Sequence, residues 1–363
     1  MAGSGEVRVG LIGYGLAGEA FHAPLIATTP EMRLAAVVTS DAERAARVRA
    51  AYPEAAVVGS AERLWERADG LDLVVVASPN RTHVPLARAA LGAGLPVVVD
   101  KPLAATAAEA RGLVEEARRR ALLLTVFQNR RWDGDFLTLR RLLAGGALGT
   151  VHRFESRFER WRPEPKGGWR ERGDPAEAGG VLYDLGSHLV DQALLLFGPV
   201  REVYAEVERR RPGVETDDDA YLALSHVSGV RSHLWASLVA PDYGPRFRVL
   251  GSRAAYVKHG LDVQEAALRG GARPGPGWGE ETLERWGRVG AEEAWMPIPT
   301  ERGAYPVFYA GVAASLRYGG PPPVDPMDAV AGLEVLEAAR RSAAEGAVVR
   351  LQGGDVAEAS GRG

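Results

Sequence analysis

Short apolar runs rich in valine, leucine and isoleucine alternate with amphipathic stretches from Val7 to about Phe127. Strand-length runs that alternate with helix-period segments predict successive strand-helix units. Because these runs are apolar throughout, both faces of each strand should be covered, which is typical of a doubly wound parallel sheet with helices on both sides. The expected strands are residues 7–13, 34–39, 56–58, 71–77, 96–99 and 122–127, and the expected helices are residues 17–27, 42–51, 84–93 and 107–120.

The pattern changes near residue 128. A helical segment at 135–144 precedes strand-like runs at 151–160, 203–209, 220–227, 231–238 and 247–257, and Ser228-Gly229 between two of them is a hairpin signal. Runs of strands joined by hairpins indicate an α+β domain with a mainly antiparallel sheet. The Gly/Pro-rich stretch 270–279 is predicted to be a surface loop. We therefore expect an α/β domain over residues 1–127 and an α+β domain over residues 128–363.

The composition excludes several classes of protein. The 363 residues hold 44 Lys and Arg against 47 Asp and Glu, so the formal charge of −3 gives no global attraction toward nucleic acid or anionic membranes. Cysteine is absent, which excludes disulfides, thiol nucleophiles and thiolate metal sites. The longest apolar runs, such as residues 73–77, are far shorter than a membrane span. These features predict a cytoplasmic protein without nucleic-acid or membrane partners.

A glycine motif follows the first expected strand. Gly13, Gly15 and Gly18, with Leu16 and Ala17 between the last two, fit G-x-G-x-x-G at the start of the next helix. In such a motif the first glycine makes the tight turn, the second lets a pyrophosphate approach the backbone, and the third lets helix and strand pack closely. Amides at the helix start then face the phosphates. We therefore interpret this motif as a dinucleotide-binding loop rather than as a turn without a ligand.

The end of the second expected strand bears on which dinucleotide is bound. A carboxylate there would hydrogen-bond the ribose 2′-hydroxyl and repel a 2′-phosphate, whereas a hydroxyl followed by a cation would accept the phosphate. Ser40 takes the place of the acid, Asp41 follows it, and Arg44 lies one turn later. The pattern is mixed, and it favours NADP over NAD only slightly.

A candidate catalytic helix occurs in the second half of the chain. Asp184, His188 and Asp191 are spaced i, i+4 and i+7, which puts them on one helix face with leucines on the opposite side. One interpretation is an acidic, solvated face that carries a histidine. The other is catalytic, because alcohol oxidation needs a base for the hydroxyl proton, and Asp184 could orient His188 and support its imidazolium. One helix supplies too few ligands for zinc, so no metal is expected.

The segment Asp100-Lys101-Pro102 stands at the end of the fifth expected strand. Ligands of doubly wound sheets bind outside the carboxyl ends of the strands, so the topology places Lys101 near the nicotinamide. A lysine there can hydrogen-bond the reacting oxygen and stabilise its alkoxide character. The alternative is an ordinary surface lysine.

Together these residues resemble the Gfo/Idh/MocA oxidoreductase family. The resemblance rests on GYGLAG at 13–18, VVVDKP at 97–102 and YDLGSHLVD at 183–191, and it covers nearly the whole chain. It implies an N-terminal Rossmann domain followed by a C-terminal α/β domain with a large open sheet, which usually supports a homodimer or homotetramer. Within the family, residues 10–26, 129–139 and 169–188 look most like the NADP-dependent scyllo-inositol dehydrogenase branch.

The resemblance implies roles for individual residues. Lys101, Asp184 and His188 correspond to the catalytic lysine, aspartate and histidine. Asp100 replaces the glutamate that precedes the lysine in the family, and Gln128 replaces a histidine, which leaves the exact substrate open. The expected substrate-binding residues are Asp191, Lys101, Gln128 and Tyr305; the expected cofactor-binding residues are Gly13, Gly15, Leu16, Ala17, Gly18, Ser40, Asp41, Ser78, Pro79, Asn80, His83, Asp100, Lys101, Trp169 and Arg170.

Basic residues are concentrated between positions 128 and 172. They form either a solvated surface with ion pairs inside the domain, or a contact from Arg131 or Arg170 to a phosphate of the cofactor or to an anionic substrate. The residues alone do not decide between these two interpretations.

The leading expectation is an NAD(P)-dependent oxidoreductase that transfers hydride between the nicotinamide and a cyclic polyol or sugar. Two alternatives stay open. An NAD-dependent glycoside hydrolase would release sugar without a net change in the nicotinamide, and a non-catalytic sensor would bind the dinucleotide without turnover. Which polyol is used, and in which direction, does not follow from the residues.

Overall fold

The computed structural model describes residues 5–165, 167–168, 171 and 173–351, and the chain divides into two compact units. The first unit contains the residues up to Trp132 together with Val263–Trp278 and Ala304–Val330. The second contains Asp133–Asp262, Gly279–Gly303 and the residues from Ala331 onward. The sequence analysis assigns every residue after 127 to the second domain, whereas two later segments of the chain return to the first unit.

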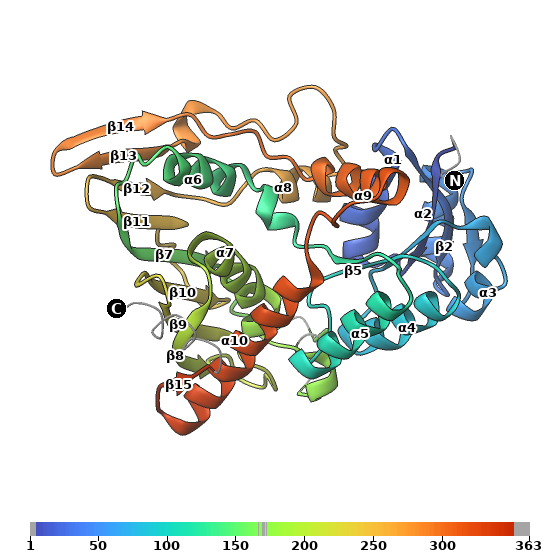
Figure 1. Cartoon of the computed structure of the whole chain (residues 1–363), viewed down its shortest axis with the longest axis horizontal. Helices are drawn as coiled ribbons and strands as arrows, with labels where there is room; N and C mark the ends of the chain where they lie inside the picture. The colour runs from blue at the N-terminus through green and yellow to red at the C-terminus, as the bar shows by residue number, and fades with distance from the viewer. Residues whose placement is uncertain (1–4, 166, 169–170, 172, 352–363) are drawn as a thin grey trace, which may run out of the picture. The chain divides into compact units, whose positions relative to one another are not determined.

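The first unit is built on a six-stranded parallel sheet with the order β3-β2-β1-β4-β5-β6 (Figure 1). Its central strands are buried on both faces, which explains the unbroken apolar runs. The expected doubly wound fold is confirmed. The strands are β1 (Val7–Ile12), β2 (Met32–Val38), β3 (Ala56–Val58), β4 (Leu73–Val76), β5 (Val97–Val99) and β6 (Leu124–Val126).

The helices of this unit mostly begin where the sequence indicates. Asp41 accepts a hydrogen bond from the Arg44 amide and Thr106 accepts one from the Glu109 amide, so both cap the helices that follow them. The expected helix at 17–27 is not uniform, because it opens with a π-helical turn. The helical elements are η1 (Gly18–His22), α1 (Ala23–Ala27), α2 (Ala42–Ala51), α3 (Ala61–Trp65), η2 (Ala68–Gly70), η3 (Asn80–Thr82), α4 (His83–Gly92), α5 (Ala107–Arg119) and η4 (Asn129–Trp132).

The two returning segments add α8 (Gln264–Arg269), α9 (Pro306–Tyr318) and the start of α10 (Pro326–Glu345) to the first unit. Helix α9 contacts α1 (Figure 1), and α8 contacts η1. Phe308, Tyr309 and Val312 of α9 are wholly buried in the same apolar cluster as Leu25 and Phe127. Burial of these large side chains removes them from water and ties α9 to the start of the Rossmann fold.

The second unit is built on an open nine-stranded sheet with the order β14-β13-β12-β11-β7-β10-β9-β8-β15 (Figure 1). All of its pairs are antiparallel except β7 with β10, so the mainly antiparallel sheet is confirmed. The strands are β7 (Val151–Glu159), β8 (Val200–Glu208), β9 (Asp219–His226), β10 (Arg231–Ser237), β11 (Phe247–Gly251), β12 (Ala255–Lys258), β13 (Gly287–Ala291), β14 (Ala294–Ile298) and β15 (Val349–Arg350).

The single strand expected at 247–257 is wrong. The structure divides it into β11 and β12, which pair as a hairpin, with Phe247 opposite Lys258. The turn follows Gly251, where a Cβ atom would collide with the carbonyl of Leu148, so the backbone of a neighbouring segment passes close at this point. A glycine inside an expected strand is the local signal of such an approach, and the sequence analysis did not use it.

One face of this sheet is covered by helices. Helix α6 (Gly134–Ala144) packs Phe136 against Phe247 of β11, and α7 (Ser187–Phe197) contacts β7 and β10. Ser342 of α10 accepts a hydrogen bond from the Ala205 amide of β8. Along β9 buried and half-buried residues alternate strictly, as expected when a sheet has only one covered face. This unit also contains η6 (Pro175–Glu177), η7 (Leu182–Gly186) and η8 (Leu283–Arg285).

Candidate functional site

The glycine loop after β1 has the three spatial properties that the motif requires. Gly13 has φ +98°, and a Cβ atom there would lie 2.6 Å from the carbonyl oxygen of Ala77. A Cβ atom on Gly18 would collide with the carbonyl oxygen of Gly13, so this glycine lets the helix pack against the strand. A Cβ atom on Gly15 would meet no atom of the described residues within 4 Å. The loop therefore leaves open space at the position where a pyrophosphate would approach.

This contrast between the glycines gives a paired prediction. We expect Gly15→Ala to change the unfolding free energy by less than about 0.5 kcal/mol, because the methyl group meets no neighbour, but to weaken NAD(P)H binding at least about tenfold. Gly18→Ala should cost about 1–3 kcal/mol of stability through overpacking. Denaturant unfolding and cofactor fluorescence measure the two effects. Equal binding by wild type and Gly15→Ala would contradict the proposed role of this loop.

The residues after β2 show how the adenosine side is arranged. Ser40 and Asp41 are both exposed. The Arg44 amide donates to Asp41 Oδ1 at 2.9 Å and, with the Arg44 guanidinium, holds the pKa of Asp41 below its usual value. The Arg44 guanidinium lies 4.0 Å from Asp41 Oδ2. Asp41 is thus engaged as the cap of α2, which leaves the exposed Ser40 hydroxyl and the neighbouring cation beside the strand end.

His83 joins two loops at the carboxyl ends of β4 and β5. It is buried, with Nδ1 at 2.8 Å from the Pro102 carbonyl and Nε2 at 2.9 Å from the Ser78 carbonyl. Burial is the largest influence and lowers the pKa of His83, whereas Asp100 and the carbonyl oxygens that face its two ring nitrogens act in the opposite direction. The Ser78 hydroxyl also bonds Thr82 Oγ1 at 2.6 Å. His83 therefore links its own segment to the Asp100-Lys101-Pro102 turn by a hydrogen bond. This segment contains four of the expected cofactor-binding residues, Ser78, Pro79, Asn80 and His83.

Asp100 and Lys101 form this turn after β5. The Lys101 amide donates to Asp100 Oδ1 at 2.9 Å, and the Asp100 side chain is 15% exposed. Burial raises the pKa of Asp100, but His22, Lys101 and His83 together lower it by more, so its pKa lies below the usual value. The carboxylate is therefore ionised at neutral pH and faces three cationic or polar side chains. Lys101 is half-buried, unlike an ordinary surface lysine.

Gln128 stands just after β6, at the same edge of the sheet. Its side chain is 5% exposed, and its Oε1 atom is buried without a hydrogen-bond partner among the described residues. An unpaired buried acceptor costs about 1–3 kcal/mol, so such an atom usually has a partner supplied by a ligand or water. This atom and the open space over Gly15 both lie at the carboxyl edge of the sheet, where ligands of parallel sheets bind.

The expected catalytic helix lies in the second unit and differs from the simple helix of the sequence analysis. Asp184 belongs to the π-helical turn η7, and His188 and Asp191 belong to α7, which follows directly. His188 and Asp191 are only 5% and 4% exposed, so the solvated acidic face is wrong for these two residues. The His188 ring stacks on Phe158 of β7 with centroids 6.4 Å apart. A π-helical turn within a helix is frequently found at functional sites.

A buried arginine that the sequence analysis missed supports this helix. Arg246, which precedes β11, donates to Gln192 Oε1 at 2.7 Å and to Ser156 Oγ at 2.6 Å. Asp135 of α6 lies 3.6 Å from the guanidinium. Gln192 is the neighbour of Asp191 on α7, so these bonds limit rotation of the helix that carries Asp191 and His188. Arg246 lies far from these residues in the sequence, and nothing in its local pattern indicates the contact.

Further residues that the sequence analysis names for substrate or cofactor binding are a buried tyrosine, an ion-paired arginine and two residues outside the described part of the chain. Tyr305 is 0% exposed, within the apolar cluster of the first unit, and its amide donates to Gln264 Oε1 at 2.8 Å. Arg131 forms an ion pair with Asp328 at 2.9 Å. For this residue the structure therefore agrees with the interpretation of the basic segment as ion-paired. Trp169 and Arg170 lie outside the described residues.

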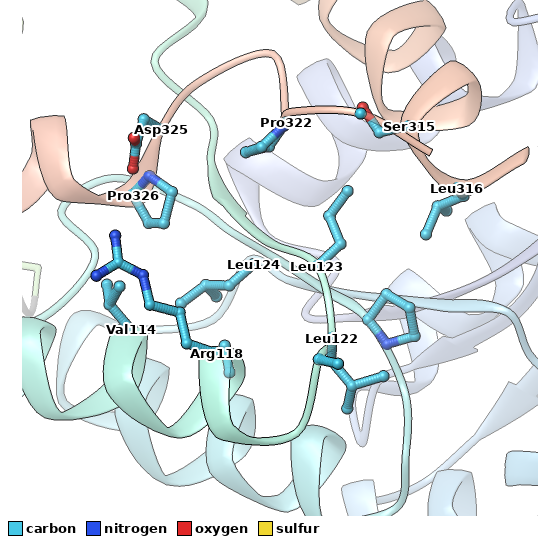
Figure 2. A pocket seen from close by; sticks show the side chains of 14 residues that line it. Val114, Arg118, Leu122, Leu123, Leu124, Ser315, Leu316, Pro322, Asp325 and Pro326 are labelled. Carbon is cyan, nitrogen blue, oxygen red and sulfur yellow. The ribbon is translucent and has the colours of Figure 1, made fainter. Parts of the chain in front are cut away.

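A cavity of about 510 Å³ lies at the opposite edge of the first sheet (Figure 2). Pro96 and Leu123, which directly precede β5 and β6, line it together with Leu316 of α9, and Arg118 and Asp325 are its charged members. Ligands of parallel sheets bind at the carboxyl ends of the strands, whereas this cavity is at the amino ends. It is therefore separate from the candidate cofactor site.

Neither a metal cluster nor a membrane-spanning helix occurs in the part of the chain that the structure describes. No three histidine or acidic side chains there are grouped closely enough to hold a metal ion. None of the helices there has both the length and the apolar content that crossing a bilayer requires.

Comparison with known proteins agrees with this arrangement. Residues 7–128 match the model of an oxidoreductase family with an NAD-binding Rossmann fold, and residues 136–257 match the GFO/IDH/MocA C-terminal domain. The chain is 42% identical to the uncharacterized oxidoreductase YdgJ of Escherichia coli over 354 residues, which are 96% of this chain and 99% of YdgJ. It is 35% identical to the scyllo-inositol 2-dehydrogenase (NADP(+)) IolW of Bacillus subtilis, over 95% of this chain and 96% of IolW.

Solved structures show the same architecture. The yvaA protein of Bacillus subtilis superposes with a TM-score of 0.91 at 34% identity, over 97% of this chain and all of that chain. Both domain models, these relatives and the open glycine loop after β1 lead to one conclusion. The chain belongs to the Gfo/Idh/MocA family of NAD(P)-binding oxidoreductases.

Proposed function

We propose that this protein is an NADP-preferring dehydrogenase or reductase that acts on a cyclic polyol or sugar of the inositol type. The observation that carries the proposal is the buried pair of His188 and Asp191 on one helix, in a chain whose glycine loop leaves room for a dinucleotide. Buried ionisable groups are costly, and on one helix face a histidine can exchange a hydroxyl proton while a carboxylate binds a neighbouring hydroxyl of the same substrate.

Each residue has a defined task in this proposal. In the direction of oxidation, His188 accepts the proton of the reacting hydroxyl at an imidazole nitrogen, and Asp184 orients the ring and supports the imidazolium. Lys101 donates a hydrogen bond to the same oxygen and stabilises its negative charge. Asp191 accepts a hydrogen bond from a neighbouring hydroxyl of the substrate. When bound, the nicotinamide takes up the hydride from the substrate carbon and returns it in the reverse direction.

The substrate class is supported by chemistry and by a relative. IolW carries the name of an enzyme that oxidises scyllo-inositol with NADP(+), and it covers nearly the whole chain. A ring that carries many hydroxyls needs several acceptors and donors, and Asp191 and Gln128 supply both kinds. We propose that the unpartnered Gln128 Oε1 accepts a hydrogen bond from a substrate hydroxyl.

Cofactor preference rests on the end of β2. Asp41 is held as the cap of α2, and the Arg44 guanidinium 4.0 Å from its carboxylate would turn from it toward a 2′-phosphate beside the exposed Ser40. We expect Arg44→Ala to raise the Kd for NADPH about tenfold and the Kd for NADH less than about twofold. Fluorescence titration with both cofactors checks this. A similar loss of affinity for NADPH and NADH would show that Arg44 supports the fold rather than binding the 2′-phosphate.

The decisive experiment follows absorbance of the reduced nicotinamide with purified protein, NAD and NADP in parallel, and a panel of inositols and aldoses. Reduction of NADP by scyllo- or myo-inositol supports the proposal. Release of free sugar from a glycoside without a net absorbance change would replace it with the glycoside hydrolase alternative. Cofactor binding without any turnover across polyols, aldoses and glycosides would replace it with the sensor.

A further inference from the structure

Asp100 has a buried neighbour that the proposed chemistry does not use. His22, the last residue of η1, is 0% exposed, and its Nε2 atom lies 3.9 Å from Asp100 Oδ1. Its Nδ1 atom lies 2.6 Å from the hydroxyl oxygen of Tyr309 on α9, which is also wholly buried. The three side chains therefore form a line from α9 through η1 to the turn that carries Lys101.

The donors and acceptors in this line determine where the protons lie. Among the described residues, the hydrogen-bond partner of the Tyr309 hydroxyl is His22, so a proton on Nδ1 would leave the hydroxyl hydrogen without an acceptor. Burial, with a smaller contribution from Asp100, raises the pKa of Tyr309 well above its usual value, so the hydroxyl keeps its proton. Tyr309 is then the donor to Nδ1, and the imidazole hydrogen lies on Nε2, toward Asp100.

The electrostatics at the other end of the line favour the same tautomer. Asp100 is ionised, and an Nε2–H group facing its carboxylate is attracted, whereas a bare Nε2 lone pair would be repelled. The separation of 3.9 Å is longer than a hydrogen bond, so the interaction orients the carboxylate without taking the bond that Oδ1 accepts from the Lys101 amide. Lys101 and His83 are the other charged or titratable groups that face this carboxylate.

We infer that Tyr309 and His22 are positioning residues that hold the Asp100 carboxylate, and through it the backbone of Lys101, in one arrangement. The inference rests on the proposed function, in which Lys101 contacts the reacting oxygen. It assigns a task to the returning segment 304–330, whose helix α9 supplies the hydroxyl that selects the His22 tautomer.

The surroundings of His22 make the arrangement rigid. The His22 ring lies 4.4 Å from the Phe127 ring between centroids, and Phe127 in turn packs against Phe308 at 5.0 Å. Phe127 directly follows β6 and Phe308 directly precedes Tyr309, so the aromatic contacts join η1 to α9 through the segment after β6. Close packing of this kind allows few alternative rotamers.

The first test needs no substrate. Nitrogen-15 NMR of the seven histidines in the full chain, with His22→Gln to assign the signal, reports which imidazole nitrogen is protonated. At neutral pH we expect His22 as the Nε2–H tautomer, with the Nδ1 signal shifted by the hydrogen bond from Tyr309. In Tyr309→Phe the Nδ1 signal should move toward the position of an unbonded imine nitrogen. An Nδ1–H tautomer or an imidazolium in wild type overturns the inference.

The second test separates positioning from stability by a matched pair of substitutions. His22→Gln keeps an amide N–H near the Nε2 position, toward Asp100, whereas His22→Asn keeps a polar group near the Nδ1 position, toward Tyr309. We expect His22→Gln to retain at least about fivefold more kcat than His22→Asn, with the KM for the cofactor changed less than about twofold. Equal kcat values for the two variants would overturn the inference.

Tyr309→Phe keeps the inference testable if the His22 variants do not fold, because this substitution removes only one oxygen atom. We expect its kcat to fall about fivefold with little change in cofactor KM. The matched control is Tyr256→Phe, because the buried Tyr256 hydroxyl has no hydrogen-bond partner among the described residues. An unchanged kcat in Tyr309→Phe overturns the inference. If no substrate of the panel turns over, the proposed function fails, while the tautomer measurement still tests the buried line by itself.

Discussion

His188→Ala is expected to lower kcat by about three orders of magnitude while the Kd for NADPH stays within about threefold of wild type. In the proposed mechanism the buried His188 imidazole accepts the hydroxyl proton, and alanine has no group that can do so. Cofactor affinity should persist because the glycine loop and Ser40 belong to the first unit, whereas His188 belongs to the second. Stopped-flow absorbance of the reduced nicotinamide measures kcat, and fluorescence titration measures Kd.

The matched control for this prediction is His152→Ala. His152 lies on β7 of the same unit and is exposed, so its removal should change kcat less than about twofold. The kcat of Asp184→Asn should lie between the kcat values of His188→Ala and His152→Ala, because asparagine keeps the shape of the side chain but loses the charge that supports the imidazolium. Unchanged turnover in His188→Ala, with the protein folded, would remove His188 from the mechanism.

Lys101→Met is expected to lower kcat by about two to three orders of magnitude. Methionine keeps most of the aliphatic length of lysine, but it cannot donate a hydrogen bond to the reacting oxygen. The Asp100 carboxylate would also lose a neighbouring cation that helps to hold its pKa low. Steady-state kinetics over a range of substrate concentrations should show the loss mainly in kcat, because the interaction is strongest when the oxygen carries negative charge.

Two further variants test whether the lysine acts by position or by charge alone. Lys101→Arg keeps the charge but changes the donor geometry, so it should recover only part of the activity. Arg118→Met removes an exposed cation of the same unit from the cavity at the amino edge of the sheet, and kcat should stay within about twofold. A comparable loss in Arg118→Met would show that the net charge of the unit, rather than Lys101 itself, governs turnover.

The buried line from Tyr309 to Asp100 explains why local reasoning about the DKP segment is incomplete. The sequence analysis places Lys101 correctly after β5 and identifies Asp100 as its acidic neighbour. It does not identify His22 or Tyr309, because these residues are separated by 287 positions and each stands in an ordinary helical pattern. The only local signal is a histidine among apolar residues shortly after the glycine loop, which is also typical of a core histidine.

Local patterns were sufficient wherever burial and backbone geometry are set by neighbouring residues. The apolar runs predicted all six strands of the first sheet, because strands covered on both faces are mostly apolar. The spacing of Gly13, Gly15 and Gly18 predicted the glycine loop, and the expected helices at 42–51 and 107–120 follow Asp41 and Thr106, which cap them in the structure. Each of these features leaves a signal in a short stretch of sequence, even where the contacts that require it come from distant segments.

Tertiary structure decided the features that depend on distant segments. The π-helical turns that contain His22 and Asp184, the hairpin of β11 and β12, and the parallel pairing of β7 with β10 leave no periodic signal of their own. The return of residues 304–330 to the first unit follows from burial of Phe308, Tyr309 and Val312, and that of residues 263–278 from burial of Leu268 in the same cluster. Amphipathic helices of this kind could have packed on either unit. Hydrophobic burial is not directional, so the sequence alone predicts which side chains are buried, whereas the fold decides against which partners.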